Sequence, residues 1–117
     1  MIRIYHNPQC KKSRAGLEYL KNSGLDFELV EYLKKPLSRE QLQQIIKKSG
    51  LEAKNLIRTQ EEVYKTNYKE LQLSDDQWIE AIIQYPKLLK RPFVESADKA
   101  VLADPPENIQ LLLNKIK

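Results

Sequence analysis

Residues 2–13 are IRIYHNPQCKKS, and the fold can be predicted outward from this run. Ile2 and Ile4 alternate with other residues, which is typical of a short strand with one apolar face. Pro8 interrupts the strand, because proline lacks a backbone N–H and favours turns. A helical pattern begins directly after Cys10. The sequence therefore places Cys10 between a predicted strand and the first turn of a predicted helix.

Short elements follow along the rest of the chain, and glycines and prolines mark many of their ends. The predicted elements are a helix from about Lys11 to Gly24, a strand over 27–32, a helix from Ser38 to Gly50, short helices and turns over 51–73, a helix from Ser74 to Pro86, strands over 93–95 and 100–102, and a last helix from Asp104. The connections between them are short, which favours one compact domain.

Cap residues define the starts of three of these helices. Ser38 and Ser74 each precede a glutamine by three residues, which matches the capping-box pattern. Asp104 is predicted to cap the last helix, with Pro105 at its first position and Glu107 closing the box. The predicted core faces of the last two helices are Trp78, Ala81, Ile82 and Tyr85, and then Ile109, Leu112, Leu113 and Ile116.

The element order is β-α-β, then a helical block, then β-β-α. A parallel strand pair joined by a helix, followed by an antiparallel hairpin and a helix, is typical of an α/β thioredoxin-like fold. We therefore expect one thioredoxin-like domain over residues 1–117, with a helical insertion at about residues 38–90.

Composition limits the classes of function. Of the 117 residues, 41% are hydrophobic and 31% are charged, which fits a globular domain. There is no apolar run of the ~20 residues that a membrane-spanning helix needs and no signal-peptide pattern, so we expect a cytoplasmic protein without a membrane partner. The net charge of +4 comes from scattered basic residues. A solvated basic surface and an anionic substrate both explain it, and no nucleic-acid partner or metal site is expected.

The single cysteine is the candidate nucleophile. Cys10 is predicted at a helix N-terminus, where free N–H groups and the helix dipole lower the pKa of a thiol. Lys11, Lys12 and Arg14 add positive charge, and His6 is close enough in sequence to assist, particularly when it is protonated. The alternative is a buried and unreactive cysteine.

Residues 10–13, CKKS, have the spacing of a redox C-x-x-C site with serine in the second position. Thiol exchange needs a second sulfur to release a mixed disulfide. Cys10 is the only cysteine of the chain, so a reductase cycle would need an outside thiol. Alternatively, Ser13 only bonds to the helix backbone.

Four segments resemble, in order, the motifs of the glutaredoxin-dependent arsenate reductase (ArsC) family. They are IYHNPQCKKSR at 4–14, LIRT at 56–59, YPKLLKRPFV at 85–94 and DPPE at 104–107. The likeness extends over nearly the whole chain. It implies a thioredoxin-like fold with a helical insertion, and a cis peptide bond before Pro92, which would face Cys10.

The resemblance also implies a division of roles. Cys10 would be the nucleophile, and His6, Ser13 and Arg14 would stabilise its thiolate. Two oxyanion-binding arginines would be Arg58 and Arg91, whose guanidinium groups offer forked donors to oxyanions; the alternative is that each forms a surface ion pair. Arsenate or a similar oxyanion would be the substrate, glutathione the co-substrate and glutaredoxin the partner, with no bound cofactor.

One position departs from the family pattern. The arsenate reductases have a third arginine directly before this Pro-Pro-Glu-like segment, and this chain has Asp104 there. If its carboxylate faces the pocket, it repels a dianion by a few kcal/mol at ~6 Å and an effective dielectric constant of ~20, before screening. As a helix cap, it would instead face the backbone.

Three functions remain open from the sequence. The first is an arsenate reductase-family oxidoreductase, and the second is a general glutathione-linked thiol reductase, which the missing arginine favours. The third is an RNA polymerase-binding regulator of the related Spx type. Those regulators use a C-x-x-C switch, and Ser13 removes that switch here.

Overall fold

The computed structural model describes residues 2–116, and the side chains of residues 2–112. Its strands are β1 (Ile2–Tyr5), β2 (Phe27–Val30), β3 (Phe93–Glu95) and β4 (Ala100–Leu102). Its α-helices are α1 (Lys11–Asn22), α2 (Arg39–Ser49), α3 (Glu62–Asn67), α4 (Asp75–Gln84) and α5 (Ile109–Ile116). Short 3-10 helices cover η1 (Ala53–Leu56), η2 (Pro86–Leu88) and η3 (Pro106–Asn108). None of the described helices is long and apolar enough to cross a membrane.

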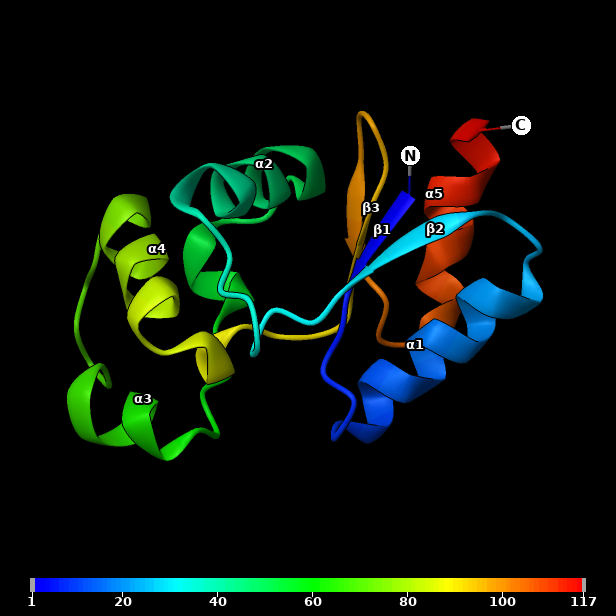
Figure 1. Ribbon diagram of the computed structural model, residues 1–117. Coiled ribbons are helices and arrows are strands. Elements are labelled where there is room, and N and C mark those ends of the chain that lie inside the picture. Colours follow the sequence, from blue (N-terminus) through cyan, green and yellow to red (C-terminus); the bar gives the residue numbers. More distant parts are fainter. Residues whose placement is uncertain (1, 117) are drawn as a thin grey trace.

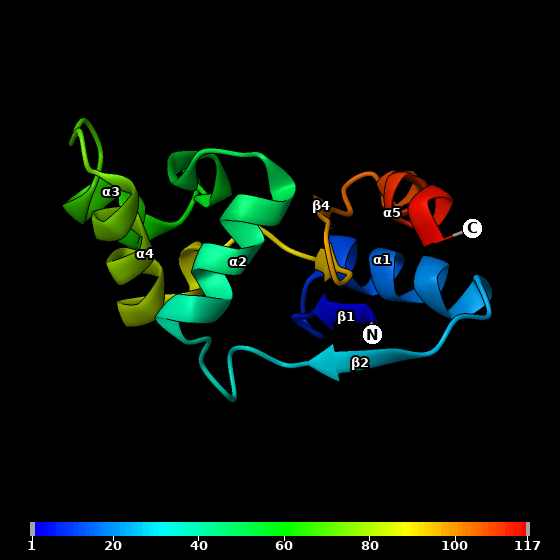
Figure 2. The same cartoon turned by 90° about the horizontal axis from the view of Figure 1, so that it is seen from above.

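The strands form one mixed sheet in the order β2-β1-β3-β4. β1 runs parallel to β2, whereas β3 is antiparallel to both β1 and β4. The helices α2, α3 and α4 come between β2 and β3 in the chain, and lie to one side of the sheet in two views (Figures 1 and 2). This arrangement confirms the predicted α/β thioredoxin-like fold.

Each face of the sheet has its own hydrophobic cluster, because successive strand residues point to opposite faces. Ile4 and Val94 pack with α1 and α5, in a cluster that includes the fully buried Leu20. Tyr5 and Phe93 point the other way and pack with the insertion. The buried members that α2 and α4 contribute to this second cluster are Leu42, Ile45, Trp78, Ile79, Ala81 and Ile82.

The two predicted serine caps are confirmed. The hydroxyls of Ser38 and Ser74 accept hydrogen bonds from the backbone N–H of Gln41 and Gln77, and both capping boxes are complete. Gly50 ends α2 in the left-handed conformation, with φ of 73°, which glycine adopts without the steric penalty of a side chain.

The predicted cap at Asp104 is wrong. Pro105 occupies the N-cap position of η3, which has no side-chain cap, and α5 begins only at Ile109. The carboxylate of Asp104 instead lies 3.0 Å from the Lys12 ammonium group.

Two further predictions concern the last helix and the second strand. Of the predicted core face of the last helix, Ile109 and Leu112 are buried, whereas the side chains of Leu113 and Ile116 lie outside the described part of the chain. The predicted strand over 27–32 is two residues too long, because β2 ends at Val30.

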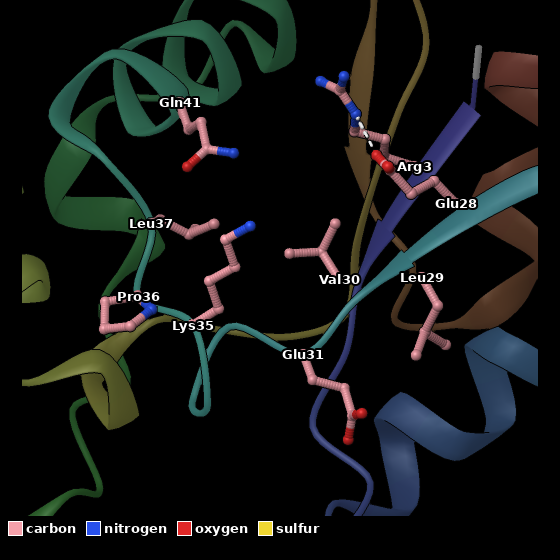
Figure 3. Close-up of a pocket in the computed structure, with 9 residues that line it drawn as sticks. All are labelled: Arg3, Glu28, Leu29, Val30, Glu31, Lys35, Pro36, Leu37 and Gln41. Carbon is pink, nitrogen blue, oxygen red and sulfur yellow. Dashed lines mark hydrogen bonds and ion pairs between the residues drawn. The ribbon is translucent and has the colours of Figure 1, made fainter.

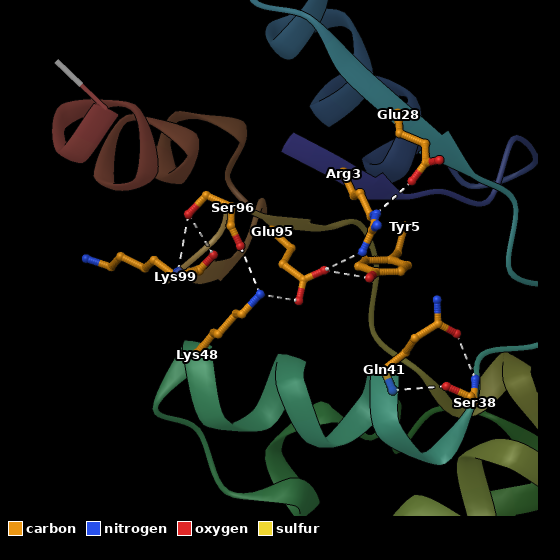
Figure 4. Close-up of polar contacts among 9 residues, drawn as sticks. All are labelled: Arg3, Tyr5, Glu28, Ser38, Gln41, Lys48, Glu95, Ser96 and Lys99. Carbon is orange, nitrogen blue, oxygen red and sulfur yellow. Dashed lines mark hydrogen bonds and ion pairs between the residues drawn. The ribbon is translucent and has the colours of Figure 1, made fainter. Parts of the chain in front are cut away.

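A buried polar cluster joins α2 to the sheet (Figure 4). Glu95 on β3 is 4% exposed, and its carboxylate accepts a hydrogen bond of 2.6 Å from the Tyr5 hydroxyl. The Lys48 ammonium group donates to the same carboxylate and to the Ser96 carbonyl, each at 3.0 Å. A buried charge is tolerated only when it is paired and hydrogen-bonded. Lys48 on α2 can pair with Glu95 only when α2 lies at this position over β1 and β3, so the cluster favours this placement of the helix.

Helix α1 approaches Pro92 closely at Gly16. The Arg91–Pro92 peptide bond is cis. A Cβ atom at Gly16 would lie 2.6 Å from Cγ of Pro92, a distance that atoms of this kind do not adopt without a shift of the structure. Glycine at this position therefore lets the segment with Arg91 and Pro92 pack directly against the helix that Cys10 precedes.

The close approach predicts a loss of stability in Gly16→Ala. Alanine in a helix interior normally stabilises by about 1 kcal/mol relative to glycine. Here we expect the clash to outweigh that gain, so that the free energy of unfolding in urea falls by about 1–3 kcal/mol. Glu18→Ala, at an exposed position of the same helix, is the control and should change stability by less than about 0.5 kcal/mol. A Gly16→Ala protein more stable than wild type would contradict the packing described here.

Candidate active site

Cys10 occupies the N-cap position of α1. Its backbone is extended, with φ of −96° and ψ of 123°, and its side chain makes no cap hydrogen bond. Its N–H donates to the Asn7 carbonyl at 3.0 Å, which closes the turn between β1 and α1. The side chain is partly exposed. The sulfur is therefore close to the free N–H groups of the first helical turn, and the residue is not fully buried.

The pKa of the Cys10 thiol is lowered. Burial raises it, but the backbone N–H groups of Ser13 and Lys12 and the positive charge of Arg91 together outweigh burial. Helix N–H groups and a guanidinium group both favour a thiolate over a thiol. The surroundings therefore favour ionisation of Cys10, and Arg91 is the side chain that contributes most to this.

His6 and Ser13 form a buried pair beside Cys10. Nδ1 of His6 lies 2.7 Å from the Ser13 hydroxyl, which also accepts a hydrogen bond of 2.9 Å from the Asn7 N–H. Burial lowers the pKa of His6, so the neutral ring is favoured over the protonated ring, which would assist the thiolate most. The Ser13 hydroxyl bonds to the loop and to His6 rather than to the helix backbone, and this pair holds the Cys10 turn in shape.

Arg14 lies on the outer side of this turn. Its Nη1 donates to the Pro8 carbonyl at 3.0 Å, and its charge contributes to the lowered pKa of His6. The structure therefore ties Arg14 to the loop before Cys10.

A backbone bridge joins the segments that carry Arg58 and Arg91. Ile57 pairs with Leu89 in an isolated antiparallel bridge. The Arg58 N–H donates to the Leu88 carbonyl at 2.7 Å, and the Lys90 N–H donates to the Leu56 carbonyl at 2.8 Å. These bonds fix the register of two segments that are about thirty residues apart in sequence. The register determines how far the backbone of Arg58 lies from the backbone of Arg91.

The two arginines have different partners. Nη1 of Arg91 donates to the carbonyls of Lys87 at 3.1 Å and Leu89 at 3.4 Å, whereas its buried Nε has no partner among the described residues. Nε of Arg58 donates to the Glu61 carboxylate at 3.2 Å. Arg91 is thus oriented by backbone carbonyls and Arg58 by a neighbouring carboxylate.

Both arginines line one small pocket of about 220 Å³. Its lining residues are Lys12, Arg58, Gln60, Lys90, Arg91, Leu102 and Asp104. Four of them are cationic and one is anionic, which leaves a net charge of +3 on the lining. Asp104 therefore does face this pocket, but its charge is paired with Lys12. Sequence reasoning did not place Lys90 here, although it directly precedes Arg91.

A second hollow lies between β2 and α2 (Figure 3). It has a volume of about 360 Å³, and the 2.6 Å ion pair between Arg3 and Glu28 lies on its wall. It is larger than the pocket at the arginines, but Cys10 does not line it. Among the described residues, no three His, Cys, Asp or Glu side chains converge as metal ligands. Cys10 is not among the residues that line the smaller, cationic pocket either, but Arg91, whose charge lowers the pKa of Cys10, does line it.

The positive charge of Arg91, which acts to lower the pKa of Cys10, predicts that Arg91→Gln raises that pKa. The rate of alkylation by iodoacetamide at neutral pH should then fall, because only the thiolate reacts. Arg14→Gln removes the same charge from a side chain bonded to Pro8 and is the matched control, with a smaller effect. An unchanged pH profile of alkylation in Arg91→Gln would contradict this account of the site.

Comparison with known proteins agrees with this geometry. The model of the ArsC family matches residues 5–112. An arsenate reductase of Haemophilus influenzae is 40% identical over 114 residues, covering 96% of this chain and 98% of the relative. The uncharacterised YfgD protein of Escherichia coli is 39% identical over 110 residues and covers 92% of both chains. The structure of an arsenate reductase from Vibrio cholerae superposes with a TM-score of 0.87 at 39% identity, covering 93% of this chain and 94% of the other. The chain therefore belongs to the ArsC family.

Proposed function

We propose that this protein reduces arsenate, with Cys10 as the nucleophile and glutathione and glutaredoxin as the source of electrons. The observation that supports this most strongly is the position of Arg91, which lines the cationic pocket and acts to lower the pKa of the Cys10 thiol. The same residue would stabilise the thiolate and hold the substrate anion. The similar proteins that bear the name arsenate reductase support the choice of oxyanion.

The proposed reaction has three steps. First, the Cys10 thiolate attacks arsenic, an S–As(V) bond forms, and one arsenate oxygen leaves and is protonated to water. Second, a glutathione thiolate attacks the Cys10 sulfur, so that an S–S bond forms and the S–As bond breaks. The electron pair of that bond reduces As(V) to As(III), which leaves as arsenite. Third, a glutaredoxin thiolate attacks the glutathione sulfur and releases the Cys10 thiolate.

Arg58 and Arg91 would act in the first step. Their guanidinium groups offer hydrogen-bond donors to the arsenate oxygens. Their positive charge also reduces the repulsion between the negatively charged arsenate and the incoming thiolate. Lys12 and Lys90, on the same pocket wall, add to this potential. Cys10 reappears unchanged after the third step, and Ser13 explains why an external thiol is needed.

Asp104 favours a second candidate function, a glutathione-linked thiol reductase without arsenate activity. A carboxylate in the pocket weakens the binding of a dianion, even with Lys12 beside it. Such an enzyme would reduce glutathione mixed disulfides through Cys10 and would show no activity with arsenate. Measuring both activities in the same preparation separates the two candidates.

The proposal predicts that Cys10→Ser abolishes reduction. Arsenite formation should depend on arsenate, glutathione and glutaredoxin together, and Cys10→Ser should reduce it to the uncatalysed rate. The urea unfolding curve of the variant serves as the control for folding. Equal rates of arsenite formation for the wild type and Cys10→Ser would exclude arsenate reduction through Cys10. Equal rates with glutathione mixed disulfides would exclude the thiol reductase.

The charge of Asp104 predicts a gain of anion affinity in Asp104→Arg. Replacing the carboxylate by a guanidinium group should lower KM for arsenate by about tenfold, which corresponds to about 1.4 kcal/mol. Glu18→Arg makes the same change of charge on the exposed side of α1 and should have little effect. If both variants lower KM equally, the effect is long-range and Asp104 does not act in the pocket.

A further inference from the structure

Two buried polar atoms in the described structure lack a hydrogen-bond partner, the hydroxyl of Tyr32 and Nε of Arg91. Tyr32 is only 1% exposed. Buried polar groups in native proteins almost always have a partner, because an unsatisfied donor loses its bond to water without compensation. An unpaired hydroxyl at this depth therefore calls for a bound group that accepts its proton.

Tyr32 lies at the same edge of the sheet as Cys10. It follows β2 by two residues, and the parallel strand β1 leads to the Cys10 turn. The His6 N–H donates to the Val30 carbonyl at 2.9 Å, so the two chain segments leave the sheet side by side. Tyr32 also packs in the cluster that contains Ile57 and Leu89, the bridge residues next to the arginines.

The electrostatics agree with this placement. Burial raises the pKa of Tyr32 to about 12, Arg91 and Arg58 act to lower it, and Cys10 acts to raise it. The hydroxyl therefore remains protonated at neutral pH and can donate. Its pKa responds to Arg91, Arg58 and Cys10, so the hydroxyl lies near these groups although Tyr32 packs in the hydrophobic cluster.

Arg91 is the link between this hydroxyl and the pocket, because it acts on the pKa of Tyr32 and also lines the pocket, where Tyr32 itself is not a lining residue. The Nε atom of Arg91 is likewise buried without a partner among the described residues. The hydroxyl of Tyr32 can donate as well as accept, and neither its proton nor the Nε–H of Arg91 has an acceptor among the described residues. An oxygen of a tetrahedral oxyanion is such an acceptor, and the net positive charge of the pocket lining favours it.

We propose that Tyr32 is a substrate-binding residue, whose hydroxyl donates a hydrogen bond to an oxygen of the oxyanion that Arg91 holds. This inference rests on the proposed function and adds to it a neutral donor from the segment after β2. It gives the site a further hydrogen-bond donor in addition to Arg58 and Arg91. This donor does not take the place of the third arginine, whose position in this chain is Asp104.

The test compares Tyr32→Phe with Tyr5→Phe, which removes a buried hydroxyl that already has a partner, the Glu95 carboxylate. Inorganic phosphate and arsenate are the probes, and affinity is measured without turnover, from the protection of Cys10 against alkylation. We expect Tyr32→Phe to weaken binding of both anions by about tenfold, because the lost bond is to a charged group. The unfolding midpoint in urea without anion should stay unchanged in Tyr32→Phe. Tyr5→Phe should lower that midpoint and leave anion affinity unchanged.

Three results would overturn the inference. The first is equal anion affinity of Tyr32→Phe and wild type. The second is a loss of stability without anion in Tyr32→Phe as large as that in Tyr5→Phe, since the hydroxyl would then serve the fold. The third is a wild-type protein that binds neither anion. Anion binding without arsenate reduction would instead refute the proposed function and leave the role of Tyr32 supported.

Discussion

The ionisation of Cys10 is the feature on which the proposed active site depends. It is favoured by backbone N–H groups of α1 and by the positive charge of Arg91, about eighty residues further along the chain. The N–H groups are present wherever a helix begins, whereas Arg91 comes near Cys10 only if the whole domain is folded. The close contact of Pro92 with Gly16 and the bridge between Ile57 and Leu89 bring this about.

The helical insertion contributes to the site through its attachment to the sheet. The buried cluster of Glu95, Tyr5 and Lys48 holds α2 on the strands. The bridge then places Arg58 beside the segment that returns to β3. The pocket combines cations from α1, from the insertion and from the segment before β3, with Asp104 paired to Lys12 on its wall. It therefore attracts anions although one carboxylate lies within it.

Local sequence signals predicted most of the fold, and contacts between distant residues account for what they did not predict. The capping boxes at Ser38 and Ser74 depend on neighbouring residues, so their positions follow from the sequence. The role of Asp104 does not, because its partner Lys12 is at the other end of the chain. The unpaired hydroxyl of Tyr32 is likewise a result of tertiary packing: in the sequence, Tyr32 is only the end of a predicted strand.

The most direct test of the account is the ionisation of Cys10 in the folded protein compared with the same protein unfolded in urea. The absorbance of the thiolate, or the rate of alkylation as a function of pH, gives the pKa in both states. The account predicts a pKa in the folded protein clearly below the unfolded value, which should lie near the ordinary value of about 8.5. A folded protein whose Cys10 ionises at or above the unfolded value would contradict the central claim, because neither α1 nor Arg91 would then stabilise the thiolate.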